Sequence, residues 1–230
     1  MSQLKFALGF SAIESIGSRI FDFAILWIVL NTLPEADIAK FGLATASIFF
    51  FNLIFFAPET ALLRNQKEWT ENGELPNYLS AFILFSVLKL ALHFGLILII
   101  ISVYGLNHWL IYGIIFSIIT QQIQLSEIVR IYMRMELQQR FVAKFELFSK
   151  FSLFLLCLIL FEFAILEIYF AIYFIWSFVI SLAWLLQLKK KIYLKPIGVK
   201  SSLNFILKAS LGFSFWTHFS GILTYYIYNA

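Results

Sequence analysis

Residues 90–126 contain no Asp, Glu, Lys or Arg. A helix of about 20 apolar residues crosses the hydrocarbon core of a bilayer, so this run is long enough for two membrane-spanning helices. The hexapeptide Tyr104-Gly-Leu-Asn-His-Trp109 has the composition of a turn and predicts the break between them. The run therefore favours an all-α, polytopic membrane protein.

The composition of the whole chain agrees with such a fold. Of its 230 residues, 61% are hydrophobic and 13% are charged, and the mean hydropathy is +0.88. Soluble domains are typically about 45–50% apolar and about 25% charged. The excess indicates lipid-facing surface rather than a large core. The hydrophobic segments predict seven spans, at about 7–31, 41–61, 78–103, 109–130, 147–163, 166–188 and 205–228.

The basic residues alternate between the segments that connect these spans. Most lie at Lys5 or in the connections 62–77, 130–146 and 189–204, whereas the connections 32–40, 104–108 and 164–165 together hold one base, Lys40. Because basic connections stay in the cytoplasm, the N-terminus is expected on that side. The net charge of +4 then reflects membrane topology rather than a nucleic-acid-binding surface.

The first predicted span carries charges where a plain anchor would carry Leu or Val. Six polar residues share an arc of about 140° on a helical wheel: Ser11, Glu14, Ser15, Ser18, Arg19 and Asp22. One charge at bilayer mid-depth costs roughly 2.5–3.5 kcal/mol on insertion scales, so three of them favour a water-filled cavity. In that interpretation Arg19 holds an anion, and Glu14 or Asp22 exchanges a proton or sodium ion. The alternative is a helix seam in which Arg19 and Asp22 form a structural ion pair.

The third predicted span carries Lys89 and His93, which are four residues apart and share one face. Lys89 is too far from the cytoplasmic edge to extend its amine back to water. It is either a second cation for an anionic substrate or a partner of Glu14 or Asp22. His93 alone is more typical of a hydrogen-bonded core residue.

The fourth predicted span carries amides and hydroxyls on one face, within an arc of about 120°: Ser117, Thr120, Gln121 and Gln124, followed by Glu127 near the inner edge. Such groups suit the hydroxyls of a sugar. They equally suit ordinary hydrogen bonds between helices. Gln121 and Gln124 are the candidates for contact with a glycan.

Two stretches resemble a known family. SRIFDFAILWIVLNTLPEADIAKFGLATASIFFFNLIFFAPETALLR combines a serine-arginine pair in the first helix, an acidic loop before Phe41-Gly42, and Ala61-Leu62-Leu63-Arg64 at the end of the second helix. SEIVRIYMRMELQQRFVAKFELFSKFSLFLL looks like that family's inner loop between helices four and five. In these features residues 1–200 resemble the polysaccharide flippases of the multidrug/oligosaccharidyl-lipid/polysaccharide exporter superfamily. The family commonly has glycine where Pro58-Glu59 stands here.

The resemblance implies an architecture of two six-helix lobes that rock to expose a central cavity alternately. Residues 1–188 would form the N-terminal lobe, 189–204 the cytoplasmic linker, and 205–230 the first helix of a second lobe. The chain is then expected to be an N-terminal portion, with the other lobe missing from it; a homodimer of half-transporters is the other arrangement. Its location would be the bacterial inner membrane.

The resemblance also implies the substrate, a lipid-linked oligosaccharide on a polyprenyl diphosphate. In related flippases arginines of the first two helices help bind the diphosphate, and Arg19 and Arg64 match them. Lys89 would be an added cation. No cofactor is expected; the coupling ion would be sodium or a proton, carried by Glu14 or Asp22.

Two other functions stay open. The first is a drug or cation antiporter of the same fold, which would depend on the acids and use Arg19 as a structural partner. The second is a membrane-embedded glycan-processing enzyme; such enzymes need catalytic residues in sizeable loops, and the longest outer loop here has about nine residues. The chain is therefore not expected to be an enzyme. The only cysteine, Cys157, excludes an internal disulfide or a cysteine-based metal site.

Overall fold

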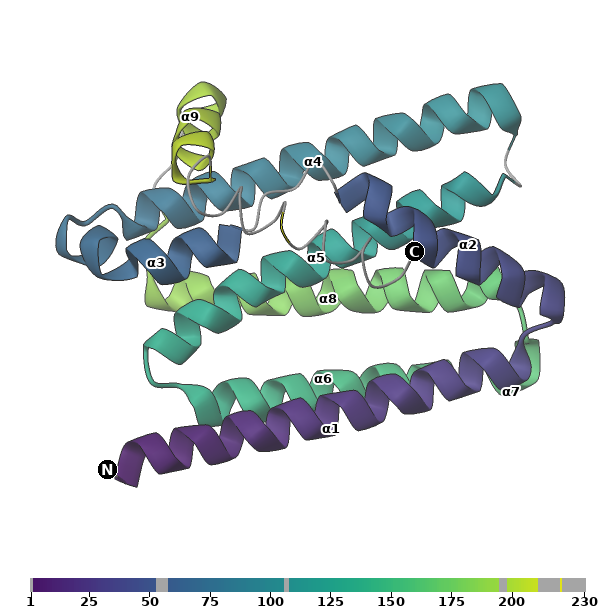
Figure 1. Ribbon diagram of the computed structural model, residues 1–230, viewed down its shortest axis with the longest axis horizontal. Helices are drawn as coiled ribbons and strands as arrows, with labels where there is room; N and C mark the ends of the chain where they lie inside the picture. Colours follow the sequence, from purple (N-terminus) through teal and green to yellow (C-terminus); the bar gives the residue numbers. More distant parts are fainter. Residues whose placement is uncertain (1, 53–57, 106–107, 195–197, 211–219, 221–230) are drawn as a thin grey trace.

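The computed structural model describes residues 2–52, 58–105, 108–194, 198–210 and 220 (Figure 1). Within these ranges the regular structure is entirely helical, which confirms the predicted all-α class. The helices are α1 (Ser2–Thr32), α2 (Glu35–Asn52), α3 (Pro58–Glu71), α4 (Leu75–Tyr104), α5 (Trp109–Met135), α6 (Gln139–Cys157), α7 (Leu160–Phe163), α8 (Leu166–Lys191) and α9 (Val199–Ser210).

Among the residues that the structure describes, three helices are long and apolar enough to cross a membrane: α4, α5 and α8. They correspond to the predicted spans 78–103, 109–130 and 166–188. The predicted break after α4 is also confirmed, because α4 ends at Tyr104 and α5 begins at Trp109. Gly105 caps α4 with a positive φ of 83°, a conformation that glycine adopts without steric cost, and its N–H donates to the Ile101 carbonyl.

Other predicted boundaries differ from the structure. The predicted span 41–61 begins in α2 and ends in α3, and its residues 53–57 lie outside the described residues. The predicted loop 130–146 is mostly helix, with only residues 136–138 between α5 and α6. α9 begins inside the predicted linker, and most of the predicted span 205–228 lies outside the described residues.

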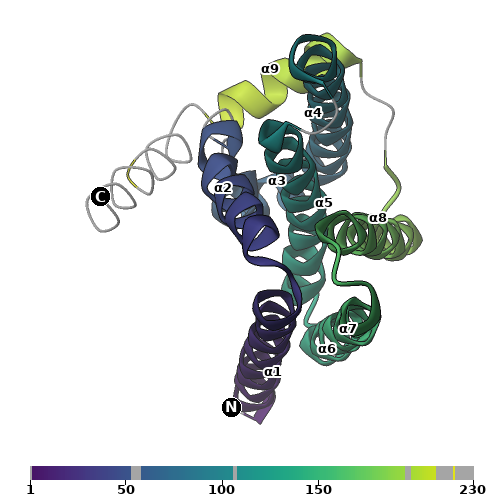
Figure 2. The ribbon, with the colours of Figure 1, turned by 90° about the vertical axis from the view of Figure 1, so that its right-hand side faces the viewer.

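The helices form two groups. In one group α5 is central and packs against α2, α4 and α8, while α9 crosses α4 (Figure 2). In the other group α1 lies along α6, and α6 in turn contacts α8. The apolar side chains divide in a similar way: one buried cluster surrounds the stacked rings of Trp69 and Tyr78, and another joins α1, α2, α5, α6 and α8 around Ile28 and Phe170.

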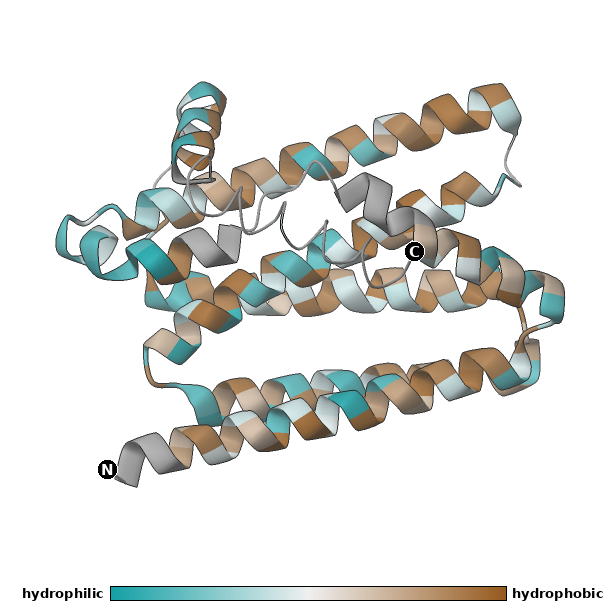
Figure 3. Cartoon of the chain, in the orientation of Figure 1, coloured by the Kyte–Doolittle hydropathy of each residue, from teal (hydrophilic) through white to brown (hydrophobic). Residues whose placement is uncertain are grey.

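The connections rich in bases lie at one end of the helices. The α3–α4, α5–α6 and α8–α9 connections share that end with the N-terminus, whereas the α1–α2, α4–α5 and α7–α8 connections lie at the opposite end (Figure 1). Figure 3 shows that polar residues interrupt α1 and α6 along their length, while the second half of α4 is almost wholly apolar.

Gly17 of α1 packs directly against a side chain of α6. A Cβ atom built there would overlap Leu147 Cδ2, whereas one at Gly9 on the same helix would meet nothing within 4 Å. We expect Gly17→Leu to push α6 away and to cost about 1–3 kcal/mol of stability through overpacking. The thermal midpoint of the detergent-purified protein should fall for Gly17→Leu and stay near the original value for Gly9→Leu. Equal midpoints for both variants would contradict the close approach.

Candidate functional site: a charged pocket between α1, α5, α6 and α8

A polar pocket of about 360 Å³ lies between α1 and the helices α5, α6 and α8. The lining is mainly serine and charged side chains, with three apolar or aromatic contributions from Ile123, Ile180 and Trp176. Such a lining is unusual in a chain whose helices are otherwise apolar. It makes this pocket the leading candidate for a binding site.

α1 supplies the polar stripe that the sequence predicted. All six of its members line the pocket: Ser11, Glu14, Ser15, Ser18, Arg19 and Asp22. Their spacing of three and four residues puts them on one face of the helix. Ile13, Ile20 and Trp27 on the opposite face are more than half exposed and present an apolar surface.

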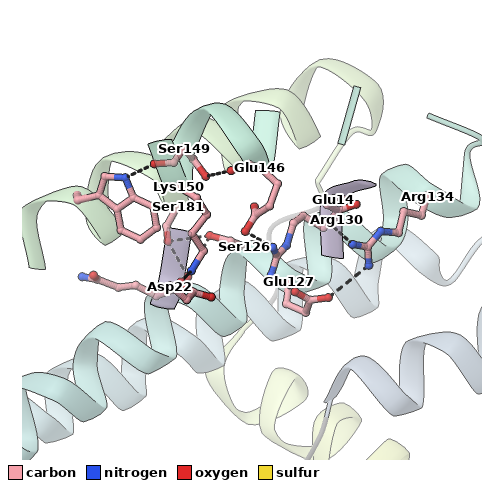
Figure 4. Close-up of polar contacts among 12 residues, drawn as sticks. Glu14, Asp22, Ser126, Glu127, Arg130, Arg134, Glu146, Ser149, Lys150 and Ser181 are labelled. Atoms are coloured by element: carbon pink, nitrogen blue, oxygen red, sulfur yellow. Dashed lines mark hydrogen bonds and ion pairs between the residues drawn. The ribbon is translucent and has the colours of Figure 1, made fainter. Parts of the chain in front are cut away.

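Ion pairs connect three helices around the pocket (Figure 4). Arg134 of α5 lies 2.6 Å from Glu14 of α1, and Lys150 of α6 lies 2.6 Å from Asp22 of α1. Arg130 of α5 lies 2.6 Å from Glu146 of α6. Glu127 accepts a hydrogen bond from Arg130 and lies 3.6 Å from Arg134. The pairs therefore tie α1 to both α5 and α6, and tie α5 to α6.

These pairs leave one base of the pocket without an acidic partner. Its acids are Glu14, Asp22 and Glu146, and each of them is in an ion pair. Its bases are Arg19, Arg130, Arg134 and Lys150. Within the part of the chain that the structure describes, Arg19 is the lining base without an ion pair. The predicted Arg19–Asp22 pair is thus replaced by Lys150–Asp22, because Lys150 of the neighbouring helix reaches that carboxylate.

Two buried polar atoms at the pocket lack a hydrogen-bond partner among the described residues. They are the Ser18 hydroxyl and Arg130 Nε. Buried polar groups in proteins are almost always satisfied by protein or by ordered water. Both residues line the pocket, so water or a bound polar ligand inside it can satisfy them.

A second pocket, of about 230 Å³, adjoins the first at the Lys150–Asp22 pair, and both residues line the two pockets. Its other walls include Tyr169 and Tyr173 of α8. These tyrosines lie nearer the start of α8 than Trp176, which lines the first pocket and lies 5.9 Å from the Lys150 amine. The Lys150–Asp22 pair therefore lies between the two pockets, which are adjacent along α8.

Four of the predicted binding residues do not line the charged pocket: Arg64, Lys89, Gln121 and Gln124. Arg64 is exposed on α3. Lys89 is buried in α4, with its amine 4.9 Å from the Phe85 ring centre. The predicted alternative that pairs Lys89 with Glu14 or Asp22 is not what the structure has, because Arg134 and Lys150 pair with those two acids.

Gln121 belongs to a separate polar contact between α4 and α5. Its amide nitrogen lies 2.9 Å from His93 Nε2, and the same ring nitrogen lies 3.1 Å from the Ser117 hydroxyl. His93 Nδ1 also lies 2.8 Å from the Lys89 carbonyl. His93 is thus hydrogen-bonded in the core, as the sequence favoured. Gln121 in this arrangement joins two helices.

Four charged residues of the pocket were not predicted from the sequence: Arg130, Arg134, Glu146 and Lys150. The first three lie in the predicted cytoplasmic loop, and Lys150 had no predicted role. A detectable signal was present, since Ser126, Arg130 and Arg134 are four apart, as are Glu146 and Lys150. That spacing places each set on one helix face, provided that the helices extend through the predicted loop.

The described residues contain no group of three or more His, Cys, Asp or Glu side chains placed to hold a metal ion. The side chains that line the charged pocket offer guanidinium, ammonium, carboxylate and hydroxyl groups. These groups can bind an anion and exchange ion-pair partners.

No protein-family model, no curated protein and no solved structure matches this sequence.

Proposed function

We propose that this chain is part of a membrane transporter that moves lipid-linked oligosaccharide across the bacterial inner membrane, with Arg19 binding the diphosphate of the polyprenyl carrier. The observation that carries the proposal is the Arg19 guanidinium, which has no ion pair among the described residues. All the lining acids of the pocket are in ion pairs, and Arg19 is the lining base left over in the described structure. An anion with oxygen acceptors suits a free guanidinium, whose planar fork binds phosphate through two parallel hydrogen bonds.

The ion pairs of the pocket make a cation antiporter the weaker candidate. A cationic substrate needs a carboxylate that is free to receive it, and the carboxylates of Glu14, Asp22 and Glu146 each have a base within 2.6 Å. Binding a cation there would first require breaking an ion pair. An anion at Arg19 requires no such step.

Ion coupling would act through the ion pairs that involve α1. A proton or sodium ion on Asp22 weakens its attraction for Lys150, and one on Glu14 does the same for Arg134. Since these two pairs tie α1 to α6 and α5, their release would loosen α1 and open the passage between the two adjoining pockets. The released Lys150 would offer the diphosphate a second cation.

The remaining parts of the transporter follow from this arrangement. The base-rich end would face the cytoplasm, where the substrate is made. The lipid tail would stay in the bilayer while the glycan passes along the polar pocket. A second lobe of the protein, or a second copy of this chain, would supply the other wall. Arg64, Lys89 and Gln124 stay predictions for contacts outside the charged pocket.

A flipping assay with two substrates tests the proposal. The protein is reconstituted in liposomes with a polyprenyl diphosphate that carries one fluorescent sugar, and dithionite is added outside to bleach exposed label. We expect the protected fraction to fall in protein-containing vesicles relative to protein-free ones. A cationic dye, measured in parallel with a pH gradient, should show no protein-dependent accumulation. Dye accumulation without flipping would instead favour the antiporter, and release of the sugar from its carrier would favour an enzyme.

A further inference from the structure

A third pocket, of about 410 Å³, lies between α4, α5 and α8 at the end opposite the basic connections. Its walls are almost entirely apolar: Phe94 and Ile97 from α4, Ile115 and Ile118 from α5, and Phe170 and Phe174 from α8. All three helices are long and apolar enough to span a membrane. The pocket therefore lies between helices that would contact lipid, and its apolar walls suit an acyl chain.

One end of this pocket is polar. Tyr112, near the start of α5, donates a hydrogen bond of 2.5 Å to Glu167 Oε1 in the first turn of α8. Glu167 is exposed, and its second carboxylate oxygen has no partner among the residues that the structure describes. From Glu167 the pocket extends to Ile175, eight residues along α8, or about 12 Å at 1.5 Å per residue. The shape is that of an amphipath, with the polar end at the edge of the spanning helices.

The charges near the polar end favour a cation. Lys40 of α2 pairs with Asp37 at 2.9 Å, and the pKa of Lys40 is raised mainly by this hydrogen bond and further by the charge of Glu167. Two acids, Asp37 and Glu167, thus interact with one base, Lys40, at this end of the molecule. A headgroup with net negative charge would be repelled by Glu167, whereas the ammonium of a zwitterionic headgroup would complement it.

We propose that this pocket binds a phospholipid with an ammonium headgroup, with one acyl chain along the apolar walls and the amine on Glu167. The ammonium donates to the free carboxylate oxygen, while Tyr112 holds the other oxygen and thereby fixes the direction of the side chain. The site is separate from the charged pocket and does not depend on the proposed transport function.

Native mass spectrometry of the detergent-purified chain tests this site, with phosphatidylethanolamine and phosphatidylglycerol of identical acyl chains as probes. We expect tighter binding of phosphatidylethanolamine by about fivefold, the effect of one well-placed exposed ion pair. Glu167→Gln should bring the two affinities to within about twofold of each other. Ala171→Phe, which adds a ring to a residue lining the pocket, should weaken binding of both lipids.

Glu162→Gln is the matched control, because Glu162 lies in α7 at the same end of the molecule and does not line the pocket. It should keep the preference for phosphatidylethanolamine. Equal binding of both lipids by the original protein would overturn the proposal. Retention of the preference by Glu167→Gln would also overturn it, as would loss of the preference in Glu162→Gln, since the cause would then be the overall charge.

Discussion

Replacement of Arg19 by Ala is expected to lower the rate of lipid-linked oligosaccharide transfer roughly tenfold or more, while the protein inserts in the membrane normally. The physical reason is the loss of charge-assisted hydrogen bonds to the diphosphate, worth about 1.5–3 kcal/mol in a site that has no other unpaired base. Because Arg19 makes no ion pair in the described structure, its removal leaves no buried carboxylate without a partner. The fold should therefore be preserved.

Two further variants separate binding from general charge effects. Arg19→Lys keeps the charge but loses the planar fork, so its transfer rate should lie between those of the original protein and Arg19→Ala. Arg140→Ala removes an exposed arginine at the start of α6 that does not line the pocket, and it should leave transfer unchanged. Normal transfer by Arg19→Ala at a normal protein level would remove Arg19 from the mechanism.

Among single substitutions at the charged pocket, Arg130→Met is expected to lower the free energy of unfolding most. The side chains of Arg130 and Glu146 are only 11% and 10% exposed, and their pair joins α5 to α6. Without Arg130, Glu146 keeps a buried carboxylate with no base in contact, whereas Glu127 still has Arg134 at 3.6 Å. Breaking a buried pair from one side costs about 3 kcal/mol or more. The thermal midpoint of the purified protein should fall by several degrees.

A second substitution checks that the cost comes from the stranded charge. Adding Glu146→Leu to Arg130→Met removes the unpaired carboxylate, so the double variant should regain much of the lost stability. Glu127→Gln should have a smaller effect than Arg130→Met, because the Glu127 side chain is one-third exposed. A double variant that is less stable than Arg130→Met would contradict this explanation.

The sequence identified one wall of the candidate site because α1 carries its polar residues in an apolar background. Six polar side chains on one face of an otherwise apolar helix form a recognisable pattern, and all six line the charged pocket. The long charge-free run likewise predicted α4 and α5 and the turn between them. The polar face and the charge-free run are patterns within neighbouring residues. They can therefore be recognised in the sequence without knowing which helices pack together.

The opposite wall was missed for a different physical reason. The mean hydropathy is low in the segment that contains Arg130, Arg134 and Glu146. A segment of low hydropathy between apolar ones is typical of a cytoplasmic loop. The structure keeps this segment helical except at residues 136–138, so Arg134 pairs with Glu14 of α1, and Arg130 pairs with Glu146. Pairing partners depend on which helices are neighbours, and spacing within one helix does not contain that information. For this reason the alternative of an Arg19–Asp22 pair is not what the structure has, since Asp22 pairs with Lys150.

The accessibility of Ser15 to water tests the central claim, a wet polar pocket beside α1, most directly. A cysteine is placed at Ser15 in a Cys157→Ala background, and labelling by a membrane-impermeant maleimide is followed in vesicles. We expect Ser15→Cys to be labelled and Ile13→Cys, on the opposite apolar face at nearly the same depth, to stay unlabelled. If Ser15→Cys stayed unlabelled with and without substrate, yet was labelled fully after denaturation, the pocket would be sealed and the transport account would be contradicted.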